Sequence, residues 1–124
     1  IGDALVLLPD ARLAFAGDVA FHYVTPLAFE GHVGGWVEVC DRVGQMEIDT
    51  IVPGHGPVGS KENVRELRGY LDTIRRQARE AFDAGRTEQE AAGGIDLGEY
   101  ASWVDADRLP LNVVRLYQEF RGEI

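Results

Sequence analysis

The chain has 124 residues, and its 45% hydrophobic content is enough to bury one compact core. A formal net charge of -9 excludes nucleic acids and anionic membrane surfaces as expected partners, because both would be repelled. No apolar run approaches the roughly 20 residues that cross a bilayer. The single cysteine, Cys40, cannot form an internal disulfide and is expected to pack in the core, which favours a cytoplasmic location.

The chain opens with two predicted strands. Residues 4–8 and 12–16 are short runs of strand-forming residues, and the turn-type junction between them predicts an antiparallel hairpin. The second strand is expected to end at Gly17-Asp18. Residues 19–31 show no period, so we interpret them as a loop over the sheet edge.

A helix and a third strand follow. Apolar residues recur at helical spacing from Trp36 to Met46, which predicts an amphipathic helix. Residues 49–52 form a β-branched run before a Pro-Gly-His-Gly-Pro turn at 53–57, and this predicts a buried strand. Strand, helix and strand in this order indicate an α/β (α+β) fold.

Residues 61–124 predict a helical tail. Ser60 can cap a long helix whose apolar stripe runs from residue 64 to residue 82. Thr87 and Glu90 have the spacing of a capping box for a short helix. A final helix is expected from Leu109, with a proline in its first turn.

The predicted strands are too few to cover these apolar helix faces. The chain also begins at Ile1, just before an apolar run. We therefore expect an upstream segment, and we expect the isolated chain to bind this missing half or to self-associate through the sheet edge.

Two residues are candidates for metal binding. His55 lies between two glycines and two prolines after a predicted strand, so its imidazole should be held rigidly. Asp18 follows Gly17 at a predicted strand end, where α/β folds build their sites. Zinc, manganese and iron accept a carboxylate with an imidazole. The alternatives are a turn histidine bonded to a carbonyl and a turn or cap aspartate.

The segments 2–18 and 49–57 together resemble the second half of metallo-β-lactamase-superfamily hydrolases. The specific features are a strand followed by Gly17-Asp18, and a strand followed by Pro-Gly-His-Gly-Pro, in the same order and at similar spacing. The resemblance implies an αββα sandwich, of which residues 1–124 would be the C-terminal half. It implies that Asp18 bridges two metal ions and orients hydroxide, and that His55 binds the second ion.

The resemblance also indicates what is missing. The family's His-x-His-x-Asp-His motif belongs to its first half, and this sequence contains only His22, His32 and His55. His22 lies in the region that forms the family's substrate pocket, so it is a candidate contact for a small-molecule substrate. The alternative is an exposed loop histidine. His32 is interpreted as a polar residue that starts a helix.

The resemblance implies a metal-dependent hydrolase, with two zinc ions per complete site, that cleaves ester, thioester or amide-like bonds with metal-activated water. With two ligands, this chain alone would be inactive. The alternatives are a non-catalytic half-domain that pairs with another chain, and a di-iron redox enzyme on the same scaffold. Because a two-metal site is compact, we expect the Asp18 carboxylate and the His55 imidazole to lie within roughly 3–6 Å of each other.

Overall fold

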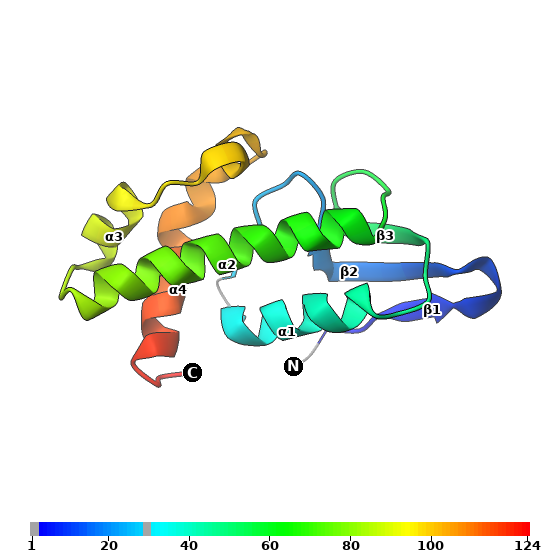
Figure 1. Ribbon diagram of the computed structural model, residues 1–124, viewed down its shortest axis with the longest axis horizontal. Coiled ribbons are helices and arrows are strands. Elements are labelled where there is room, and N and C mark those ends of the chain that lie inside the picture. Colours follow the sequence, from blue (N-terminus) through cyan, green and yellow to red (C-terminus); the bar gives the residue numbers. More distant parts are fainter. Residues whose placement is uncertain (1–2, 29–30) are drawn as a thin grey trace.

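The computed structural model describes residues 3–28 and 31–124. Over these residues the fold is α+β, as predicted, with a three-stranded mixed sheet and four α-helices (Figure 1). The elements in chain order are β1 (Val6–Leu8), β2 (Leu13–Phe21), α1 (Val33–Gly44), β3 (Thr50–His55), α2 (Lys61–Asp83), α3 (Glu88–Gly94) and α4 (Leu109–Phe120), with 3-10 helices at Pro9–Ala11, Gly98–Ser102 and Ala106–Arg108.

The sheet has the order β1-β2-β3. The predicted hairpin is confirmed: β1 pairs antiparallel with β2, and Val6 lies opposite Phe15. It is shorter than expected at its start, because β1 begins at Val6. β3 pairs parallel with β2, and α1 forms the crossover between them.

The prediction that β2 ends at Gly17-Asp18 is wrong, because the strand continues to Phe21. Gly17 adopts a φ of 52° and the register shifts on both sides of it. A glycine at positive φ lets a strand bulge and continue, whereas the sequence pattern suggested termination. β3 is also longer than predicted and reaches His55. The predicted loop over 19–31 starts after Phe21, and residues 29–30 lie outside the described residues, as does Gly2.

The helices α1 and α2 run along the sheet, whereas α3 and α4 lie around the C-terminal half of α2 (Figure 1). Ser60 caps α2 through a capping box with Asn63. The predicted stripe of α2 is buried except at its last residue, Phe82, which is partly buried. With Val113 and Leu116 of α4 its buried residues form much of the core: Val64, Leu67, Leu71, Ile74 and Ala78. Burying these side chains is the main term that stabilises the helical layer.

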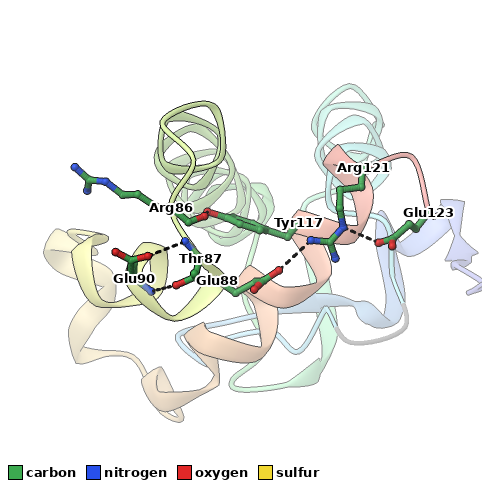
Figure 2. Close-up of polar contacts among 7 residues, drawn as sticks. All are labelled: Arg86, Thr87, Glu88, Glu90, Tyr117, Arg121 and Glu123. Atoms are coloured by element: carbon green, nitrogen blue, oxygen red, sulfur yellow. Dashed lines mark hydrogen bonds and ion pairs between the residues drawn. The ribbon is translucent and has the colours of Figure 1, made fainter.

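Polar contacts join α3 to α4 (Figure 2). The predicted capping box is present: Thr87 accepts from the Glu90 amide, and Glu90 accepts from the Thr87 amide. The Tyr117 hydroxyl donates to the Arg86 carbonyl at 2.9 Å, and Arg121 pairs with Glu88 at 3.0 Å. Side chains of this chain therefore hold the α3 and α4 segments of the helical tail together.

The hairpin end of the sheet is different. Val6, Leu7, Leu8 and Phe15 are between 43% and 56% exposed. Among the described residues β1 pairs on one side only, with β2, so it is an edge strand with unpaired backbone groups. Leu7 pairs with the buried Ala14 and so lies on the core-facing side of the hairpin, whereas Val6, Leu8 and Phe15 share the other face. We call Val6, Leu8 and Phe15 the open apolar surface.

Candidate functional site

Asp18 and His55 converge at the end of the β2–β3 pair. The Asp18 Oδ1 atom lies 3.2 Å from the His55 Nε2 atom, within the range expected from the sequence. Both side chains are accessible, with 67% of Asp18 and 47% of His55 exposed. The two residues therefore do not point in different directions, as unrelated turn residues would.

The His55 ring is oriented by an aromatic neighbour. Phe21 is its Cα partner across the parallel ladder, and the two rings stack with centroids 4.5 Å apart and planes 11° from parallel. Phe21 is itself buried and makes an edge contact with Trp36, whose Nε1 donates to the Val19 carbonyl at 2.8 Å. The ring of His55 is thus supported on one face while Nε2 stays directed at Asp18.

Both glycines beside His55 allow this close approach. A Cβ on Gly54 would lie 2.7 Å from the Gly17 carbonyl and 2.8 Å from the Asp18 Oδ1 atom. Gly56 has a φ of 95°, and a Cβ there would collide with the His22 carbonyl. The Pro-Gly-His-Gly-Pro sequence therefore serves a physical purpose, because any side chain at either glycine would push the turn away from β2.

His22 is buried, with 1% of its surface exposed, so it is not an exposed loop histidine. Its amide donates to the His55 carbonyl at 3.0 Å, and its Nδ1 lies 2.8 Å from the Pro57 carbonyl. Among the described residues its Nε2 has no hydrogen-bond partner. Burial lowers the pKa of His22, and the hydrogen bond to Pro57 opposes this in part. Contact of His22 with a substrate stays a prediction.

Asn112 of α4 holds the loop that follows His22, a role that was not predicted from the sequence. It is fully buried, accepts from the Ala28 amide at 2.8 Å and donates to the Pro26 carbonyl at 2.9 Å and the Tyr70 hydroxyl at 3.0 Å. Arg108 adds a bond to the Thr25 carbonyl. The Asn112 side chain stands beside Val113 on the apolar face of a predicted helix, and a polar side chain in such a place indicates buried hydrogen bonds.

Cys40 and His32 also carry atoms that can bind metal, but each has a structural role in this fold. Cys40 is buried, and burial raises its pKa to about 12, so the thiol stays protonated as expected for a core residue. His32 is the N-cap of α1 and accepts from the Gly35 amide at 2.9 Å, which confirms its interpretation as a residue that starts a helix.

Asp18 and His55 have donor atoms that metals accept, and these atoms lie close together. Two donors are nevertheless too few to complete a metal site. Within residues 3–28 and 31–124, no group of three or more His, Cys, Asp or Glu side chains could hold a metal ion. Catalytic zinc usually has three protein donors. The pair is therefore suited to be one part of a metal centre.

Comparison with known proteins shows the fold. No family model and no curated protein matches the sequence. It is similar to the stereoselective inverting sec-alkylsulfatase Pisa1 from Pseudomonas sp., with a TM-score of 0.71 and 17% identity over 97% of this chain, and to a double mutant of that sulfatase, with a TM-score of 0.70 and 17% identity over 97% of this chain. The chain spans 22% of the length of either structure. At this identity the likeness shows a shared fold, which this chain has in common with part of the sulfatase structure.

In the described part of the chain, no helix has both the length and the apolar character needed to cross a membrane.

Proposed function

We propose that this chain supplies part of the metal centre of a hydrolase that cleaves ester, thioester or amide-like bonds in a small-molecule substrate. The observation that carries the proposal is the 3.2 Å approach of the Asp18 carboxylate to the His55 imidazole, with both side chains accessible. The structural likeness to a sulfatase supports the hydrolytic class, and it adds sulfate esters to the candidate substrates.

The residues present have distinct tasks in this proposal. Asp18 offers two oxygens and can bridge two ions, whereas the Nε2 lone pair of neutral His55 suits a single ion. Zinc, or manganese or iron in its place, supplies water activation and polarisation of the scissile group when bound. Because two donors are insufficient, the remaining ligands would come from a segment or chain outside these residues.

Zinc titration tests the proposal. The 124-residue chain should bind zinc only weakly, at micromolar or poorer affinity, because each absent donor removes binding free energy. In the protein expressed from its own gene, Asp18→Asn and His55→Gln should each reduce zinc content and ester hydrolysis. His32→Asn is the matched control, because His32 caps a helix. Nanomolar stoichiometric zinc in the chain alone, or full activity in His55→Gln, would contradict the ligand assignment.

A second candidate is a non-catalytic half-domain that pairs with another chain. The open apolar surface on β1 and β2 favours it, since an edge strand with exposed apolar side chains is suited to contact a further segment. The partner would be the complementary half of the domain or a second copy of this chain. Hydrolysis that survives both Asp18→Asn and His55→Gln would favour this candidate over the first.

A further inference from the structure

His22 follows β2 directly and contacts three consecutive residues of the turn that ends β3. Its amide donates to the His55 carbonyl, its own carbonyl occupies the space where Gly56 would carry a Cβ, and its ring bonds to the Pro57 carbonyl. We propose that His22 is a positioning residue, which holds this turn so that the His55 imidazole faces Asp18. The inference rests on the proposed metal centre and deepens it.

The hydrogen bond to Pro57 fixes the tautomer of His22. A carbonyl oxygen only accepts, so the Nδ1 atom of His22, 2.8 Å away, must carry the proton. In the neutral ring Nε2 is then a lone pair, and it has no partner among the described residues. Of the two ring nitrogens, Nδ1 therefore holds the turn. A replacement for His22 must place an N–H donor at the Nδ1 position.

The surroundings leave little room for a different arrangement. A Cβ on Gly59 would lie 3.0 Å from the His22 Nδ1 atom, so the ring packs directly against the returning backbone. Gly59 is in turn bonded to Ile51 of β3 in both directions, at 2.8 and 3.0 Å. The His22 ring therefore lies against the Gly59 backbone, which pairs with β3, and its bond to Pro57 holds the preceding part of the same turn.

Two neighbouring residues thus fix His55 in complementary ways. Phe21 orients the imidazole by stacking, and His22 fixes the main chain on both sides of Gly56. Groups that orient a metal-binding histidine from outside the ligand set usually matter 10- to 100-fold for metal affinity. The hydrogen bond from His22 to the Pro57 carbonyl acts less directly, because it holds the backbone that carries His55 and not the imidazole itself.

Three substitutions at position 22 separate positioning from simple packing. His22→Asn puts an amide N–H near the Nδ1 position, His22→Gln puts it near the Nε2 position, and His22→Leu has no donor. In the protein expressed from its own gene, zinc affinity should fall about 10- to 100-fold in His22→Gln and His22→Leu, and stay within about threefold in His22→Asn. Ile74→Val, in the core of α2, is the control for a general loss of stability and should leave zinc affinity unchanged.

Nitrogen-15 NMR of the imidazole rings provides a readout that needs no metal. The His22 ring should show the Nδ1–H tautomer, and the His55 ring signals should shift in His22→Gln and His22→Leu but not in His22→Asn. Unshifted His55 signals, or wild-type zinc affinity in folded His22→Gln, would overturn the positioning role. If the wild type binds no zinc, the metal centre is refuted, and the NMR comparison still decides the role of His22. If His22→Leu does not fold, the Asn and Gln variants decide alone.

Discussion

The helical layer and the hairpin end of the sheet differ in how completely their apolar side chains are buried. In the helical layer, Tyr70, Leu71 and Ile74 of α2 are fully buried, and polar side chains close the contacts between helices. At the hairpin end, Val6 and Phe15 are about half exposed, and toward the opposite end of β2 the Asp18–His55 pair faces solvent. We therefore expect the helices to provide most of the stability of this chain, whereas the groups capable of chemistry lie on the sheet.

The difference shows how a stable layer can support an open site. Glu119 of α4, almost fully buried, accepts from the Val33 and Gly34 amides at the start of α1. A carboxylate at a helix N-terminus satisfies free amides and interacts favourably with the helix dipole. The strands that carry Asp18 and His55 are thus packed against helices whose ends are capped and which side chains such as Glu119 connect.

Truncating a core side chain of the helical layer should have the largest effect. Leu71 is fully buried, so Leu71→Ala should lower the free energy of unfolding by about 2–5 kcal/mol through lost burial and the cavity left behind. Urea denaturation monitored by circular dichroism measures this. A loss below about 1 kcal/mol would mean that the helical layer does not dominate stability.

The matched change at the open apolar surface should behave in the opposite way. Val6 is 56% exposed and lies opposite Phe15, so Val6→Lys should leave the unfolding free energy of the isolated chain within about 0.5 kcal/mol of the wild-type value. It should also reduce self-association in sedimentation experiments, because a lysine on an edge strand disfavours strand pairing. A wild-type chain that sediments as a monodisperse monomer would remove the basis for a partner on this surface.

An intermediate effect is expected where the helical layer holds the loop after His22. Asn112→Ala would leave three buried groups without their partner, among them the Ala28 amide and the Tyr70 hydroxyl. The expected loss is about 1–3 kcal/mol in thermal or urea unfolding.

Tyr70→Phe serves as its control, since it removes one of these bonds and should cost about 1 kcal/mol. If both substitutions cost the same, the loop contacts of Asn112 contribute nothing to stability.

The sequence predicted the helices well because their signals are local. The apolar stripe of α2, the cap at Ser60 and the capping box at Thr87 specify the helices within a few residues, and the structure has them in place. The approach of Asp18 to His55 followed from the two glycine-flanked motifs and is also present. Their binding of metal stays a prediction.

What the sequence did not predict depends on contacts between distant segments. Gly17 could end a strand or bulge it, and only the pairing of Phe21 with His55 decides for the bulge. The position of His22 likewise depends on its bond to the Pro57 carbonyl, and the loop after it is held by Asn112 of α4. Neither partner is adjacent in sequence, so a local pattern could not distinguish a buried histidine from an exposed one.

The last expected effect is a pH dependence at His22, directly after β2. Burial lowers the pKa of His22 below its ordinary value of 6.5 in the folded protein, so the unfolded chain binds the proton more readily. Stability from the neutral ring is therefore fully present above about pH 6.5 and is lost as the pH falls through the lowered pKa. His22→Asn cannot titrate, and it keeps His32, His55 and all carboxylates. Between pH 7.5 and pH 5 the wild type should therefore lose more thermal stability than His22→Asn, and equal slopes for the two proteins would mean that the ring is hydrated well enough to protonate without cost.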